Sequence, residues 1–558
     1  MNNTALSDKR PQLGHFRQIL FWPLQLKVTA KTKAKMPNQL EAAGWTFQKD
    51  LYHREQPTPY PITDYAELVY FHPFIRRFLY GNADKPAVLQ VYQRHDIKQL
   101  HVILRTDYKG TEQEELTFEV ERVNFYLFDT EMAMLVLEIA AEGTALENVE
   151  LQQIQHCLDQ LRRVYPPYWD QPSNDTYQAG HSPQTVWFTT DKGQIAPADK
   201  SNYTEPDSFL AFVDHTKSSP VAAHWKWLLN PLVPYQQDEQ DQDKIRYEQI
   251  EDERMPYMAY LAFDDPRKLT KGDFMRLALA DGGGDSNTLP YSTRSAQDFE
   301  AKYCYDVFWE TDENILAADP NHWMTTRYLC CGYAFTMIGK NEPWFFTEKK
   351  VGALSHFSHH YFQMGLITYF HKAALLMLWN QLATAVEKFS EEPEQLHQFQ
   401  DDVRQILKKV LRFTHRYWFT ELSNHFQAQA LFNWWSNHLG TRELFERIIN
   451  EAKDAYQFLD LETQKQQTNT TIRLTIVATV GLTIALILGF FGIDLQIWEQ
   501  LEPNTWKIVG IVAGTSLITM LVTLYFSKKI SCFSEAIAEN SIFSKTFWHS
   551  LLWRCWRK

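Results

Sequence analysis

Residues 1 to about 350 alternate between short β-rich runs and stretches with helical spacing of apolar positions. Alternating or clustered apolar residues, typical of strands packed on one or both faces, occur at 19–28, 99–106, 123–127 and 133–139. Residues 128–131, Phe-Asp-Thr-Glu, separate the last two runs and include residue types that favour turns. The pattern therefore predicts a hairpin there, inside a larger sheet.

A second set of strands and helices follows. A helix is predicted over 146–164, ending at Pro166, and a strand over 257–263. Thr270, with Asp273 three residues later, is a capping-box pattern that predicts the start of a helix. Further strands are expected at 302–308 and 327–337. Together these elements predict an α/β domain over 1–353 with an insertion at about 165–256.

The pattern becomes helical over 354–470, which we interpret as a stalk. One helix is expected to run to about 389 and a second from 393 to about 439, with a break at 391–393. Gly440 provides a stop and Thr441 a new start. No Gly or Pro follows before the apolar stretch, so we expect one helix over 441–492, on the order of 75 Å long. A helix of that length needs partners.

Two uncharged apolar stretches follow, at 474–493 and 508–526. Each is close to the ~20 residues that span a bilayer as a helix. A short separation favours an antiparallel hairpin, so residues 471–526 are predicted to form a transmembrane unit. A packed non-membrane hairpin is the alternative.

Charges around these stretches predict an orientation. Three acids and no base lie in 494–505, whereas bases lie outside the hairpin at Lys465, Arg473, Lys528 and Lys529. The positive-inside rule then places both termini in the cytoplasm. Residues 527–558 are basic and aromatic, which suits an interfacial helix or, equally, a packed tail.

Composition narrows the class of protein. The 558 residues carry 55 Lys+Arg against 68 Asp+Glu, a formal net charge of −13, which disfavours a nucleic-acid partner. Six cysteines without metal-ligand spacing predict reduced thiols in a cytosolic portion. The fold class predicted from these observations is an α+β membrane protein with a cytoplasmic α/β domain, stalk helices and a C-terminal two-helix hairpin.

Residues 474–479, Leu-Thr-Ile-Val-Ala-Thr, are similar to the start of the first span in the CorA family of divalent-cation channels, the two-transmembrane GxN superfamily. Gly489 and 491–494, Phe-Gly-Ile-Asp, stand in the same register where that family has Gly and Tyr-Gly-Met-Asn. The match covers about 55 residues (471–526). Two positions depart from the family: Gly-Ile-Asp replaces Gly-Met-Asn, and Thr483 replaces a proline.

The resemblance implies a homopentamer in a bacterial inner (plasma) membrane, with the first span lining a pore. It implies a pore mouth at Gly492, Ile493 and Asp494. A ring of Asp494 carboxylates would attract divalent cations such as Mg²⁺; the alternative is an ordinary interfacial acid. Divalent cations would be the transported ion or the regulator, with no organic cofactor.

Four threonines recur every fourth residue through this stretch, at Thr471, Thr475, Thr479 and Thr483. Their hydroxyls would line a wet pore if that face turned inward. Threonine hydroxyls also donate hydrogen bonds to carbonyls of their own helix, and this is an equally good interpretation of the four threonines.

His356, His359 and His360 share a predicted helix with His371, at spacings that can place two imidazoles on one metal ion. No acid or cysteine completes a ligand set locally, so packing or surface histidines are the favoured interpretation.

Three functional hypotheses follow. The leading one is a homo-oligomeric channel or transporter for divalent cations, gated by its cytoplasmic domain. The second is a non-conducting, membrane-anchored CorA-like sensor or scaffold. A tethered enzyme has no catalytic motif behind it, so we expect no enzymatic activity.

Overall fold

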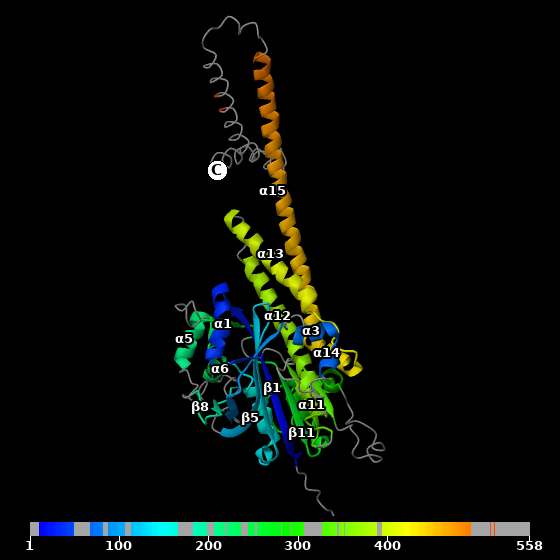
Figure 1. Ribbon diagram of the computed structural model, residues 1–558. Helices are drawn as coiled ribbons and strands as arrows, with labels where there is room; N and C mark the ends of the chain where they lie inside the picture. Colours follow the sequence, from blue (N-terminus) through cyan, green and yellow to red (C-terminus); the bar gives the residue numbers. More distant parts are fainter. Residues whose placement is uncertain are drawn as a thin grey trace, which may run out of the picture. The chain divides into compact units, whose positions relative to one another are not determined.

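The computed structural model describes residues 10–48, 67–81, 88–105, 113–165, 182–197, 206–217, 220–235, 244–251, 254–280, 282–291, 293–305, 326–342, 345–350, 352–387 and 393–492, with Gly514 and Ile518. The chain divides into two compact units, residues 1–450 and 451–558. The first unit is a mixed α+β structure built on one large sheet (Figure 1).

Within the described residues the sheet has 13 strands, and its main path runs β12-β13-β11-β1-β6-β5-β4-β7-β8. Their bounds are β1 (Leu13–Lys27), β2 (Thr46–Gln48), β3 (Gln90–Gln93), β4 (Ile97–Arg105), β5 (Gln113–Leu127), β6 (Met132–Glu142), β7 (Thr185–Thr190), β8 (Ile195–Ala196), β9 (Val233–Pro234), β10 (Arg246–Gln249), β11 (Tyr257–Phe263), β12 (Arg327–Cys330) and β13 (Ala334–Lys340). Most neighbours are antiparallel, but β11 and β13 run parallel.

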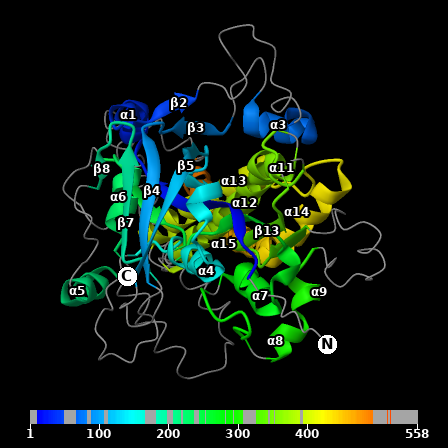
Figure 2. The same ribbon diagram turned by 90° about the horizontal axis from the view of Figure 1, so that it is seen from below.

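The described residues also form helices. They are α1 (Ala30–Ala42), α3 (Pro73–Tyr80), α4 (Leu151–Gln160), α5 (Pro206–Thr216), α6 (Ala223–Leu229), α7 (Lys271–Leu279), α8 (Thr293–Gln297), α9 (Phe299–Tyr303), α11 (Ala353–His356), α12 (Phe362–Glu387), α13 (Pro393–Arg416), α14 (Phe426–Leu439) and α15 (Thr441–Gly492). Figure 2 shows α4 and α7 side by side, where Gln155 donates to Asp273 across 3.5 Å.

The central strand β1 is buried on both faces, which explains its near-continuous apolar sequence. Phe16 and Leu20 point into the main core, on the side where Gln18 donates to the carbonyl of Leu158 in α4. Phe21 points to the opposite side and packs on Phe362 and Tyr369 of α12. The sheet is therefore a middle layer between two groups of helices.

Several predicted elements are confirmed. The hairpin at 128–131 joins β5 to β6, with Leu127 opposite Ala133. Thr270 caps α7 in a capping box with Asp273, and Gly440 ends α14 in the left-handed conformation. The long helix predicted over 441–492 is α15.

Other predicted elements are wrong in their extent or type. The helix expected over 146–164 is shortened to α4, because a 3-10 turn occupies Gly143–Leu146. The strand expected at 302–308 is not formed in its described part, because α9 continues to Tyr303 and Cys304 makes only an isolated bridge to Leu329. Residues 306–308 lie outside the described residues. The helix expected to reach 439 is interrupted after Arg416, where backbone bonds from residues 417 and 418 return to Phe413 and end α13.

The 165–256 insertion contributes to the sheet. Its strand β7 pairs with β4, and its strand β10 pairs with β1. Residues 246–249, in a charge-rich part of this insertion, form β10. Strands elsewhere in the chain therefore pair with segments of this insertion that are distant in the sequence.

The predicted membrane hairpin is not supported. Searching the described residues finds no helix that combines the length and the apolar character needed to cross a membrane. The first apolar stretch is the end of the long mixed helix α15, and the second, 508–526, lies outside the described residues except for Gly514 and Ile518. The predictions of a transmembrane fold, an inner-membrane location and ion transport are corrected accordingly.

Candidate functional site

A β-bulge in β5 places two charged side chains together on the α12 side of the sheet. Pairing of β5 with β6 shifts register between Val120 and Arg122, which makes Glu121 the extra residue. Glu121 accepts from Arg17 at 2.9 Å, and Arg122 pairs with Glu138 at 3.0 Å. Bulges redirect side chains in this way and are common beside functional sites.

A π-helical turn faces this bulge. It occupies Phe357–Tyr361 and leads directly into α12. The carbonyl of Ser358 in this turn accepts from Arg122 at 3.1 Å, and the Arg122 guanidinium lies 4.1 Å from the ring centre of Phe362. Single π turns inside helices are rare and occur frequently at functional sites.

A cavity of about 280 Å³ lies between these two irregular segments; we call it the bulge pocket. Its lining residues are Glu67, Gln93, Arg94, His95, Glu121, Arg122, Val123, Asn124, Tyr126, Ser358, His359 and Gln363. Most of these side chains are polar, and both signs of charge are present. The volume suits a molecule of metabolite size.

Glu67 is a buried carboxylate at one side of the bulge pocket. It accepts hydrogen bonds from Tyr80 at 2.6 Å, from Gln363 at 3.2 Å and from His359 Nδ1 at 3.0 Å. Burial acts to raise the pKa of Glu67, but the hydrogen bonds from His359 and Tyr80 outweigh it and hold the pKa below its ordinary value. Glu67 is therefore ionised at neutral pH.

The strongly paired charges form a fixed layer beneath the pocket. Arg17 bridges Glu121 and Glu138, and Glu138 is 1% exposed. Arg94 makes two bonds to Asp96 and lies 4.5 Å from the ring centre of Trp227. These ion pairs hold the guanidinium groups in place and use only some of their N–H donors.

Several lining groups retain capacity to bind a ligand. The Glu121 side chain is 38% exposed, and its ion pair with Arg17 uses the oxygen Oε1. Ser358 Oγ is buried and has no hydrogen-bond partner among the described residues. The His359 side chain is 35% exposed and uses Nδ1 for Glu67. The bulge pocket therefore offers the Glu121 carboxylate, the Ser358 hydroxyl and the His359 ring to a ligand, close to the Arg122 guanidinium.

The histidines singled out from the sequence do not converge on one point. His359 pairs with Glu67, whereas the rings of His356 and His360 pack together, 4.8 Å apart. His371 is buried and lies 2.6 Å from the carbonyl of Tyr417. In the part of the chain that the structure describes, no group of three or more His, Cys, Asp or Glu could hold a metal ion. A bound divalent cation stays a prediction.

The residues predicted for a pore give no assembled site. Thr471 and Thr475 are exposed on α15 and donate to the carbonyls of Gln467 and Thr471, the back-bonding alternative for these hydroxyls. Thr479, Thr483 and Gly492 lie on the same helix. Ile493 and Asp494 lie outside the described residues. Their proposed roles stay untested.

Sequence reasoning missed Glu67, Glu121 and Arg122. The Glu121-Arg122 pair interrupts the apolar alternation of β5, and this break is the one local signal that pointed to a bulge. Glu67 gave no signal, because its partner His359 is 292 residues away in the sequence.

Comparison with known proteins adds no relative. No family model, no curated protein and no solved structure matches this chain. The fold itself defines a mixed α+β protein with a large sheet, and the resemblance to the CorA family stays a prediction.

Proposed function

We propose that this chain is a ligand-responsive sensor protein, in which the bulge pocket binds a small molecule that carries both a positive and a negative group. This develops the non-conducting sensor hypothesis without its membrane anchor. The observation that carries it is the pocket itself, which a β-bulge and a π turn build from opposite charges and an unpartnered buried hydroxyl.

The balance of charge favours a zwitterion such as an amino acid. Glu67 and Glu121 line the cavity together with Arg122, whereas the Arg94 guanidinium pairs with Asp96 and lies over Trp227. These groups are already paired within the chain, so a lone cation or a lone anion would use the remaining hydrogen-bonding capacity of one sign only. A ligand with an ammonium and a carboxylate satisfies both, with the free oxygen of Glu121 suited to the ammonium.

The position of the pocket supports a sensing role. The π turn that lines it continues into α12, whose Phe362 and Tyr369 pack on the central strand through Phe21. A ligand that binds Ser358 and His359 therefore contacts the start of a helix that packs against the sheet. A ligand shifts such an element only by its differential affinity for two arrangements.

A thermal-unfolding screen against the twenty proteinogenic L-amino acids tests this proposal. At a ligand concentration of about 100 Kd, binding to the folded state adds about 2.7 kcal/mol of stability. The ligand that stabilises the protein is then compared with its decarboxylated amine and its deaminated acid. We expect the intact amino acid to stabilise the protein and the amine and the acid not to do so. The Ser358→Ala variant should be stabilised less than the wild type. Absence of any stabilising amino acid would refute the proposal.

The second unit contains a feature that favours self-association. Among the described side chains of α15, large apolar residues are exposed: Tyr456 58%, Phe458 43%, Leu461 66%, Ile472 37% and Leu474 65%. A long helix with such side chains is stabilised when a second helix covers them. We propose that another copy of this chain provides that helix, in a homo-oligomer.

A further inference from the structure

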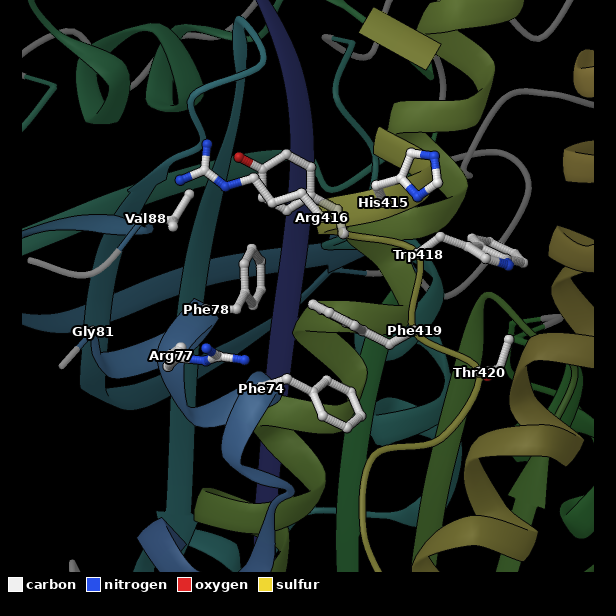
Figure 3. A pocket seen from close by; sticks show the side chains of 11 residues that line it. Phe74, Arg77, Phe78, Gly81, Val88, His415, Arg416, Trp418, Phe419 and Thr420 are labelled. Atoms are coloured by element: carbon white, nitrogen blue, oxygen red, sulfur yellow. The ribbon is translucent and has the colours of Figure 1, made fainter. Parts of the chain in front are cut away.

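A second cavity, of about 490 Å³, lies between α3 and the segment that connects α13 to α14; we call it the connector pocket. Figure 3 shows its lining, which comprises Phe74, Arg77, Phe78, Gly81, Val88, His415, Arg416, Tyr417, Trp418, Phe419 and Thr420. It shares no lining residue with the bulge pocket, so the inference below is independent of the proposed function.

The walls of the connector pocket are held in position by hydrogen bonds between its two segments. His72 N, just before α3, donates to Leu422 O at 2.9 Å, and Ser423 Oγ donates to Tyr70 O at 2.5 Å. The ring of Phe78 packs on Tyr417 and Phe419. These contacts preform the cavity and reduce the entropy that binding would cost.

Aromatic rings form one part of this lining. Phe74 lies 5.9 Å from Phe419, and Phe78 lies 5.4 Å from Phe419, measured between ring centres. Phe74 is 41% exposed despite its size. A planar ring in the cavity would stack on or pack edge-on against these faces and remove exposed apolar surface from water.

Cations form the other part. In Figure 3 the guanidinium groups of Arg77 and Arg416 lie on either side of the ring of Phe78, and both are away from Trp418 and Thr420. Arg416 is fixed by a 2.8 Å bond to Asp129, and Tyr417 also donates to that carboxylate. No described acidic residue lines the cavity. Arg77 is exposed, and the structure shows no ion pair between it and another described residue.

From this arrangement we propose that the connector pocket binds a small aromatic anion, a planar ring that bears a phosphate or a carboxylate. The ring packs among Phe74, Phe78 and Phe419, and the anionic group accepts hydrogen bonds from Arg77, while Arg416 adds positive charge to the same lining. Arginine suits this role because its planar fork matches both groups in a bidentate geometry.

Isothermal titration of the full chain with phenyl phosphate and with benzoate tests the proposal and separates the two anionic groups. Inorganic phosphate and phenol are the matched controls, since each supplies half of the ligand. We expect at least one aromatic anion to bind, and each half-ligand to bind at least tenfold more weakly. Equal affinity for phenol or inorganic phosphate, or no binding of either aromatic anion at millimolar concentration, would overturn it.

Arg77→Gln is the decisive variant, because Arg77 is exposed and its replacement leaves the core intact. The loss of a charge-assisted hydrogen bond should weaken binding by about tenfold or more. Arg404→Gln is the control, since Arg404 is a similarly exposed arginine on α13 that pairs with Asp401 away from the cavity. Circular dichroism verifies that both variants fold. Unchanged affinity in Arg77→Gln would reject the assignment.

Discussion

Glu67 shows how a single buried carboxylate is kept charged. Its three hydrogen bonds come from α3, from the π turn and from α12, so the ionised group joins segments far apart in the chain. Because its pKa is lower in the folded protein than in the unfolded chain, it stabilises the fold above the unfolded pKa. That contribution is lost as pH falls through the lowered folded pKa.

Replacing Glu67 by Gln should cost about 1–3 kcal/mol at pH 7, because three donors lose their charged acceptor. The difference from wild type should shrink as pH falls below the ordinary glutamate pKa, because the unfolded chain then binds a proton that the folded Glu67 carboxylate, with its lowered pKa, still resists. Urea unfolding at pH 7 and pH 3.5 measures both values, with Glu119→Gln as an exposed control on β5. A penalty that does not change with pH would contradict the ionised state of Glu67.

The pKa of Glu251 is shifted in the opposite direction to that of Glu67. Burial raises the pKa of Glu251 to about 7, and the nearby Lys372 and Arg162 lower it only in part. An acid with a raised folded pKa destabilises the protein progressively as pH rises from the unfolded pKa to the folded pKa, because over that range the unfolded chain releases the proton more readily than the buried group does.

Glu251→Gln should therefore be more stable than wild type at pH 8, by about 1–2 kcal/mol after allowance for partial exposure. The advantage should disappear near pH 4.5, where the carboxyl is protonated in both folded and unfolded chains. Thermal unfolding across pH 4.5–8 follows this difference. A constant offset over that range would show that Glu251 does not titrate as described.

At the scale of elements, the sequence predicts those whose signals are local. The strand Tyr257–Phe263, the Thr270 cap and the helix after Gly440 each depend on residues within a few positions of one another. The π turn, the bulge at Glu121 and the pairing of β7 with β4 depend on partners far away in the chain. The bulge pocket could not be predicted because it is made of those features.

The Thr270 cap offers a test at this scale. Its hydroxyl accepts from Asp273 N at 3.2 Å and donates to Asp273 Oδ2 at 2.9 Å. Thr270→Ala should destabilise the fold by about 1 kcal/mol, and Thr270→Ser, which keeps the hydroxyl, should cost less. Chemical denaturation measures both, and equal losses in the two variants would show that the cap is not what stabilises α7.

At the scale of the whole molecule, α15 begins in the first unit and continues into the second. Its exposed apolar side chains make self-association the expected state of the chain. Local pattern is sufficient to predict this helix, but the membrane span that the apolar stretch 474–493 predicts is not supported by the described residues. Hydropathy alone does not distinguish lipid from protein as the apolar partner.

Size-exclusion chromatography coupled to light scattering measures the mass of the protein in solution and so tests self-association. The wild-type chain should elute at a mass that is a multiple of 65.6 kDa, and Leu461→Glu should lower that mass by placing a charge in the contact. Gln457→Glu adds the same charge at another exposed position on α15 and is the control. A wild-type monomer at micromolar concentration would exclude the homo-oligomer.

The affinity of the bulge pocket for its zwitterion tests the central claim most directly. Calorimetric titration of the amino acid found by screening should give a single site on the wild-type chain. Glu121→Gln should weaken it about tenfold or more, through loss of a charge-assisted bond, and Glu115→Gln, an exposed acid on the same strand, should leave it unchanged. Equal affinities for wild type and Glu121→Gln would contradict the account.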